Sequence, residues 1–227
     1  MDFENKPMLG YGIYTVTDIA KILNLRYYKV QRLLNEYWDN RIAKDLGERY
    51  SWTDGKSKAV SFHTLVEFYT FFQLREAGIK TQEILKAHQD LSKKFDTAFP
   101  FATDCILKLI RIAGKKVLFQ ISEDEIIDLD FTGQFNIHFL VNFMKKLDFQ
   151  KEDDMASRLW PLGKKRKIVV DPKYQFGHPT IEGTRILTRI IYGMSLADEP
   201  IPFIAKTYGI SVAAVKDAIY YCSKEAA

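Results

Sequence analysis

Basic and polar side chains recur at helical spacing between residues 26 and 32. The group comprises Arg26, Tyr28, Lys29, Gln31 and Arg32. Guanidinium, ammonium and amide donors of this kind contact phosphates and base edges in DNA complexes. On one exposed helix face they predict a DNA-binding surface. A small helical hairpin with a solvated polar face is the alternative explanation for this segment taken alone.

A second basic group lies in the last quarter of the chain. It contains the run Lys164, Lys165, Arg166 and Lys167, followed by Arg185 and Arg189. Residues 164–227 hold 10 Lys and Arg against 6 Asp and Glu, which equals the formal net charge of +4 of the whole chain. The C-terminal part is therefore the basic part of the chain, although an ordinary surface also explains this charge and a solvated turn between strands explains the four-residue run by itself.

The sequence carries no recognisable catalytic motif. It lacks a glycine-rich phosphate loop, Gly-x-Ser-x-Gly, Cys-x-x-Cys and His-Glu-x-x-His. His63 and His88 are expected on helix faces or in the core, and His178 in a turn. The carboxylates of residues 122–130 alternate with apolar residues, so an exposed edge strand explains them better than a metal-dependent nuclease site. We therefore expect no catalytic residue, metal or cofactor, and no enzyme activity.

Two helices joined by a tight turn are predicted to position the first basic group. Thr17 is the expected N-cap of the first helix, Asn24 interrupts it, and a second helix begins near Arg26. Asp54-Gly55 then predicts the turn of a β-hairpin over residues 49–62, with Lys56 and Lys58 at its tip. A basic hairpin after a helix-turn-helix is typical of a wing that touches the DNA backbone.

Two longer helices are expected next. The first starts at Ser61 or Thr64 and ends at Ala77-Gly78, and the second spans Thr81–Phe95. The second helix carries an apolar stripe formed by Ile84, Leu85, His88 and Leu91. We predict that this stripe packs against a second copy and makes a homodimer; the alternative is that it packs on the chain's own middle part.

The remaining residues predict a middle unit and a C-terminal helical unit. In the middle we expect helices over 101–113 and 135–146, and strands over 115–121, 125–130, 147–150 and 158–162. At the end we expect helices from Leu187 and Ile201, and a third helix capped by Ser211. The predicted fold is mainly α with small β elements (α+β), divided into residues 1–95, 96–163 and 164–227.

The N-terminus and the cysteines bear on the compartment. The first five residues are acidic with no apolar stretch after them, so a signal peptide is not expected, and no apolar run reaches the length of a membrane span. Cys105 and Cys222 stand alone in the sequence. Two isolated cysteines suit a reducing environment, and a cytoplasmic location is expected.

Residues 11–95 resemble the MerR-like DNA-binding domain. The resemblance rests on the opening Tyr-Thr-Val-Thr-Asp-Ile-Ala, the short wing, and the string Leu-Arg-Glu-Ala-Gly-Ile-Lys-Thr-Gln-Glu-Ile. It implies a winged fold whose helix from Arg26 enters the major groove. The segment Trp38–Glu48 is longer than the family pattern before the wing.

The C-terminal segment resembles the small helix-turn-helix domain of VapB-type antitoxins, first catalogued as a domain of unknown function. The specific string is Gly-His-Pro-Thr-Ile-Glu-Gly-Thr-Arg-Ile, and Leu187 stands where the family often has Pro. The layout of the whole chain resembles one antitoxin subfamily through residues 12–15 (Gly-Ile-Tyr-Thr), 100–103 (Pro-Phe-Ala-Thr) and 160–163 (Trp-Pro-Leu-Gly).

The resemblance implies an antitoxin that binds and neutralises a PIN-type ribonuclease toxin and represses its own operator. Basic residues of the C-terminal part would then meet the acidic metal site of the toxin, with Arg185 and Arg189 favoured over Lys164–Lys167. The alternative for Arg185 is a structural bond, for example to Asp171. Two other functions remain open: a free-standing MerR-like regulator that senses a small molecule through its middle unit, and a protein-interaction adaptor without DNA contact.

Overall fold

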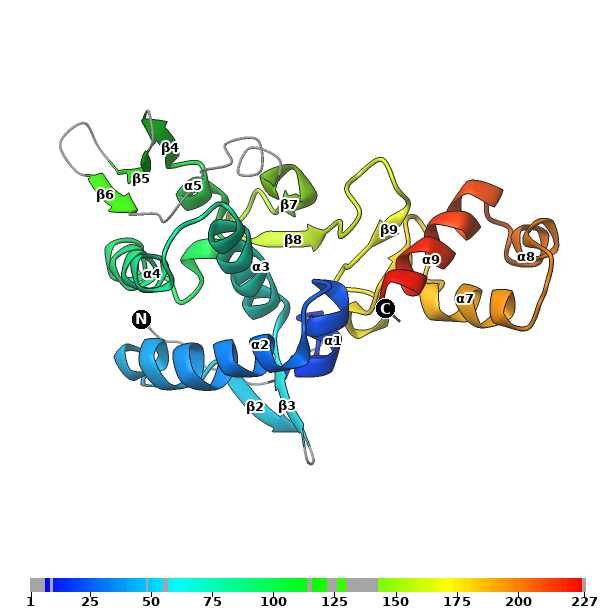
Figure 1. The fold of residues 1–227 in the computed structure, drawn as a ribbon, viewed down its shortest axis with the longest axis horizontal. Coiled ribbons are helices and arrows are strands. Elements are labelled where there is room, and N and C mark those ends of the chain that lie inside the picture. Colours follow the sequence, from blue (N-terminus) through cyan, green and yellow to red (C-terminus); the bar gives the residue numbers. More distant parts are fainter. Residues whose placement is uncertain are drawn as a thin grey trace.

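The computed structural model describes residues 7–8, 10–47, 49–54, 57–113, 116–121, 126–129 and 143–225. Helices dominate and the strands form small separate sheets, so the α+β prediction is confirmed. The C-terminal helices α7 (Thr188–Leu196), α8 (Ile201–Tyr208) and α9 (Val212–Glu225) stand at one end of the molecule, and α4 (Thr81–Phe95) lies toward the other (Figure 1). Among the described residues, we find no helix with the length and hydrophobicity that a bilayer crossing requires.

The N-terminal helix pair has the expected turn but a different cap. α1 (Val16–Ile22) and α2 (Tyr27–Arg32) are joined through Asn24, whose φ of 51° is left-handed, a conformation that asparagine tolerates. The N-cap is Thr15, and the prediction of Thr17 was wrong. The Thr15 hydroxyl accepts the Asp18 amide at 3.2 Å, and the Asp18 carboxylate accepts the Thr15 amide at 2.9 Å. This reciprocal capping box starts the helix before Thr17.

The second helix is longer than the sequence pattern indicates. After α2 the chain continues without a break as a π-type helix, η1 (Leu33–Ile42), followed by one 3₁₀ turn, η2 (Ala43–Asp45). Leu33, Leu34, Trp38 and Ile42 are buried along its length. Most of the long segment between Trp38 and the hairpin is therefore helical. This additional helix carries the chain away from the α1–α2 turn before the hairpin begins.

The predicted β-hairpin is present and belongs to a three-stranded sheet. β2 (Ser51–Asp54) pairs with β3 (Ser57–Val60), and β1 (Tyr14–Thr15) pairs with the other edge of β3. The hairpin projects below α2 (Figure 1). Gly55 and Lys56 lie outside the described residues. α3 (Phe62–Glu76) follows, and Ser61 caps it by accepting the Thr64 amide at 3.4 Å.

The apolar stripe of α4 is buried within the single chain. Ile84, Leu85, His88 and Leu91 are each 0% exposed. They pack among α3, η1, η3 (Pro100–Ala102) and β6 (Ile126–Leu129). The prediction that this stripe contacts a second copy was wrong, because the chain itself covers it. A homodimer stays a prediction without this helix face as its contact.

The middle part departs most from the expected elements. The predicted helix over 101–113 is replaced by η3, a single turn α5 (Asp104–Leu107) and β4 (Ile110–Ala113). β4, β5 (Lys116–Gln120) and β6 form an antiparallel sheet in that order, which confirms strands near 115–121 and 125–130.

Most of the predicted helix 135–146 lies outside the described residues, and its last three residues form the short 3₁₀ helix η4 (Met144–Lys146). β7 (Leu147–Phe149) pairs with β8 (Ala156–Leu159), so the second strand begins earlier than expected.

The interior of the protein has two hydrophobic clusters. The larger cluster joins buried residues of the 1–95 and 96–163 ranges and also includes Val170 of the C-terminal range. The smaller one lies in the C-terminal unit, between the two-stranded sheet of β9 (Ile168–Val169) and β10 (Thr180–Ile181) and the helices α7–α9. The three C-terminal helices begin close to the predicted positions, and the Ser211 hydroxyl accepts the Ala214 amide at 3.1 Å at the start of α9.

A tight backbone contact joins the C-terminal unit to the N-terminal strand. The Ile13 amide donates to the Phe176 carbonyl at 3.0 Å. The next residue, Gly177, has a φ of +86°, and a Cβ atom there would overlap the hydroxyl of the buried Tyr14. A glycine is therefore required for two reasons, backbone conformation and space.

We expect Gly177→Ala to destabilise the protein more than Gly183→Ala does. Gly183 also has a positive φ, of +73°, but nothing lies within 4 Å of its added Cβ, so this variant isolates the conformational cost of about 1–2 kcal/mol. Overlap with Tyr14 adds about 1–3 kcal/mol at Gly177. Urea unfolding of both variants measures the difference, and Tyr14→Phe should recover part of the Gly177→Ala loss. Equal losses for the two glycines would contradict the tight contact.

Candidate functional site

The donor-rich face of α2 is exposed along its whole length. Arg26 stands at the N-cap without a side-chain capping bond, and Tyr28, Lys29, Gln31 and Arg32 follow on the exposed side. Tyr27 and Tyr28 are 49% and 54% exposed. Val30, Leu33 and Leu34 point into the core from the opposite side. The helix therefore has one buried apolar face and one exposed face that a ligand can reach.

The basic residues of this face differ in their partners. Arg32 donates through Nε to Glu36 at 2.8 Å and through Nη2 to the Tyr37 hydroxyl at 3.4 Å. The hydrogen bond to Glu36 is the main reason that the pKa of Arg32 is raised. In the part of the chain that the structure describes, Arg26 and Lys29 form no side-chain ion pair. Arg26 and Lys29 are therefore the cations best placed to meet phosphates, while Arg32 must share its donors.

The hairpin is held against η1 mainly by one carboxylate, that of Asp39. Asp39 of η1 accepts the Ser51 amide at 3.0 Å and also accepts the Ser51 hydroxyl. Lys58 of β3 donates to Asp39 at 2.9 Å and to the Asn35 amide oxygen at 2.7 Å. Lys58 lies one residue pair from the hairpin turn, close to the predicted tip, but its ammonium group turns back onto the helix. Lys58 instead fixes the position of the hairpin relative to the helix.

The basic run 164–167 is largely engaged by carboxylates of the same chain. Lys164 pairs with Asp148 at 2.5 Å, Arg166 with Asp217 at 2.8 Å and Lys167 with Glu182 at 2.6 Å. Arg166 also lies over the Tyr220 ring, 4.3 Å from its centroid. Lys165 is exposed. This segment is a turn that ties the C-terminal helices to the rest of the chain, and three of its four charges already have partners.

Arg185 and Arg189 were predicted to act together, but they line different hollows. Arg185 lines a hollow of about 500 Å³ with Arg158 and Tyr174. Arg189 lines a smaller one of about 110 Å³ beside Asp18 and Lys21 of α1. The Arg185 guanidinium lies 5.4 Å from the centroid of the Tyr174 ring.

The suggested structural bond between Arg185 and Asp171 is not formed. The buried Asp171 pairs with Arg158 at 2.9 Å instead. Arg185 therefore keeps its guanidinium at the surface, where the contact to Tyr174 orients it.

The turn beside Arg185 has a strained backbone that the sequence does not signal. Gln175 and Phe176 have φ values of 51° and 54°, which non-glycine residues rarely adopt. Phe176 is nevertheless 60% exposed. The bond from Ile13 and the packing of Gly177 on Tyr14 hold this turn in place. Strained residues of this kind cluster at functional sites, and the neighbouring Tyr174 and Phe176 are exposed aromatic residues that sequence reasoning did not single out.

The histidines and carboxylates of the described residues can also be compared with the sequence expectations. No group of three or more His, Cys, Asp or Glu residues there could hold a metal ion. His88 is buried, with Nε2 2.7 Å from the Glu67 carboxylate. His63 lies near Tyr11 and Phe99, and burial lowers its pKa. His138, residues 122–125 and Asp130 lie outside the described residues, so the expected edge strand is seen only as β6.

Comparisons with known proteins bear on the fold and on the C-terminal unit. Residues 168–222 match the model of DUF433, a family described as a protein of unknown function. That match covers β9 to α9 and includes the Arg185 turn. No curated protein matches the chain.

The whole chain is similar in fold to a solved structure. The match is the X-ray crystal structure of Rv2018 from Mycobacterium tuberculosis, with a TM-score of 0.68 and 14% identity. It covers 94% of this chain and 99% of that chain. At this level of identity the similarity is one of fold, and it shows that the arrangement of the two helical units around a mixed middle part occurs in another protein.

Proposed function

We propose that this protein is a DNA-binding regulator that reads DNA through α2. The observation that carries the proposal is the exposed donor-rich face of α2, which is backed by a fully buried apolar face and flanked by a fixed hairpin. A rigid helix can place Arg26 and Lys29 in register with phosphates and base edges, because binding then costs little ordering of the protein. The resemblance of residues 11–95 to the MerR-like domain supports the same reading.

We further propose that the regulator is the antitoxin of a PIN-type ribonuclease toxin. Support comes from the resemblance of the C-terminal string to VapB-type antitoxins and from the exposed Arg185 beside two exposed aromatic residues. A PIN-type site is a ring of carboxylates, so a guanidinium on a rigid turn complements its charge. Aromatic residues and arginine together are the side chains most often found at the energetic centre of protein interfaces.

The Arg26→Ala/Lys29→Ala variant should bind DNA upstream of its own gene more weakly. Loss of a base contact costs about 1–3 kcal/mol, and each lost phosphate contact lowers the salt slope by about one. Fluorescence anisotropy titrations at several salt concentrations measure both quantities. Lys86→Ala/Lys151→Ala is the matched control, because it removes the same charge from exposed sites elsewhere. If both double variants bind like the parent chain, α2 does not contact the DNA.

The Arg185→Ala variant should lose the toxin, whereas Arg189→Ala should retain it. An arginine at the centre of an interface contributes about 2 kcal/mol or more, which is roughly a 30-fold change in Kd. The measurement is co-purification and calorimetric titration with the product of the adjacent gene, after melting curves show that both variants are folded. A folded Arg185→Ala protein that still binds and silences the toxin would remove this residue from the interface.

A further inference from the structure

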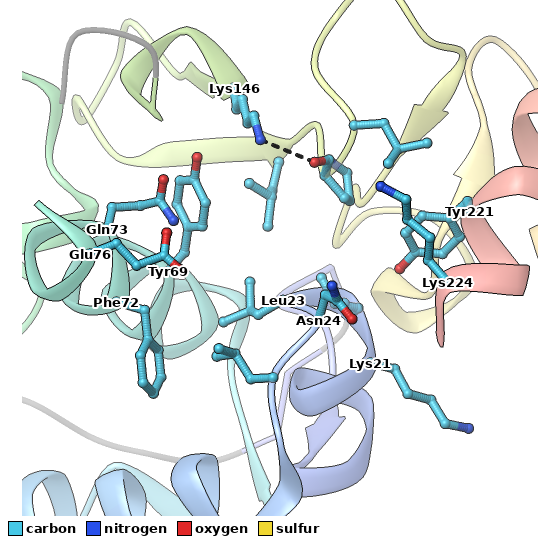
Figure 2. Close-up of a pocket in the computed structure, with 15 residues that line it drawn as sticks. Lys21, Leu23, Asn24, Tyr69, Phe72, Gln73, Glu76, Lys146, Tyr221 and Lys224 are labelled. Atoms are coloured by element: carbon cyan, nitrogen blue, oxygen red, sulfur yellow. Dashed lines mark hydrogen bonds between the residues drawn. The ribbon is translucent and has the colours of Figure 1, made fainter. Parts of the chain in front are cut away.

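A cavity of about 280 Å³ lies where three parts of the chain meet. One wall is the turn between α1 and α2, and another is the C-terminal half of α3. The third combines Lys146 and residues near the end of β8 (Leu159, Pro161 and Leu162) with the last turns of α9. Figure 2 shows Lys146 entering from one side and Lys224 entering from α9 on the other. Nothing in the proposed DNA or toxin contacts uses this space.

The charge inside the cavity is set by two lysines and one carboxylate. Lys146 is half-buried, and its ammonium group, which has three donors, makes one long hydrogen bond to a described residue, to the Pro161 carbonyl at 3.3 Å. Burial lowers the pKa of Lys146, and repulsion from Lys224 acts in the same direction. Glu76 of α3 opposes both effects. Lys21 also lines the cavity but points away from it (Figure 2).

The rest of the lining is mostly apolar or aromatic. Leu23 and Leu25 come from the α1–α2 turn, Phe72 from α3, and Leu159 and Leu162 from the third wall. The volume exceeds what a bare inorganic ion fills, and it approaches the lower end of small-molecule sites. A ligand that suits the charged and the apolar parts of the lining carries a negative group for the ammonium ions and an apolar body for the remaining wall.

The geometry points to a binding site for a small organic oxyanion, with Lys146 and Lys224 as its ligating cations. A carboxylate or phosphate between the two ammonium groups relieves their repulsion and supplies further acceptors to Lys146. The bound molecule would touch the turn that leads into α2 and the end of α9 together. An occupied cavity thus fixes the two helical units relative to each other. The site does not depend on the proposed DNA or toxin binding.

Benzoate, phenyl phosphate and neutral benzamide test the proposal, because they share one ring and differ in charge. In ¹H–¹⁵N spectra of the full chain, benzoate, phenyl phosphate or both should shift the amides of Leu23–Leu25, Leu159 and Leu162 at millimolar concentration, and benzamide should not. Comparison of the two anions identifies the preferred oxyanion. Lys146→Met should weaken binding about tenfold or more, and Lys145→Met, an exposed neighbour outside the cavity, should leave it within twofold.

A second variant tests the proposal even if Lys146→Met fails to fold. Glu76→Gln removes the opposing carboxylate, so it should strengthen anion binding severalfold at pH 8. If these residues had only a structural role, Glu76→Gln would not bind the anion more strongly. Absence of shifts with both anions overturns the proposal, and so do equal shifts with benzamide or equal affinities for all variants.

Discussion

The burial of Trp38 is the interaction on which the proposed DNA-binding surface depends. Its side chain is 0% exposed, and its ring lies 5.0 Å from that of Phe68 and 5.5 Å from those of Phe71 and His88. Because Trp38 belongs to the same continuous helix as Arg26–Arg32, locking this ring fixes which face of the helix points outward. The edge-on ring contacts add directional packing to the burial of a large apolar surface.

A buried polar pair lies beside that ring. His88 and Glu67 are both fully buried, and Glu67 also accepts the Phe101 amide at 2.7 Å. Burial raises the pKa of the Glu67 carboxyl, although His88 and the Phe101 amide act in the opposite direction. The pair connects α3, α4 and η3 directly behind Trp38 of η1. The middle part of the chain is therefore the support on which the N-terminal helix pair rests.

Sequence reasoning succeeded where local periodicity decides structure and failed where distant residues decide it. Apolar spacing identified α3, α4 and the three C-terminal helices, whose buried faces repeat every turn. It misread residues 101–113, because Phe101, Ile106 and Leu107 are buried in short turns and β4 forms only by pairing with β5. The strained turn at Phe176 and the return of Lys58 to Asp39 follow from contacts with other segments of the chain, which no local pattern encodes.

Tethered cleavage of DNA tests the orientation of α2 most directly. In a Cys105→Ser background, which removes the exposed cysteine, an iron chelate is attached to Tyr28→Cys and, as a control, to Lys86→Cys on α4. The chain is then bound to the DNA upstream of its own gene. The structure predicts strand cuts at a few adjacent base pairs from position 28 and none from position 86. Diffuse cutting from position 28, or the same pattern from both positions, would contradict the account.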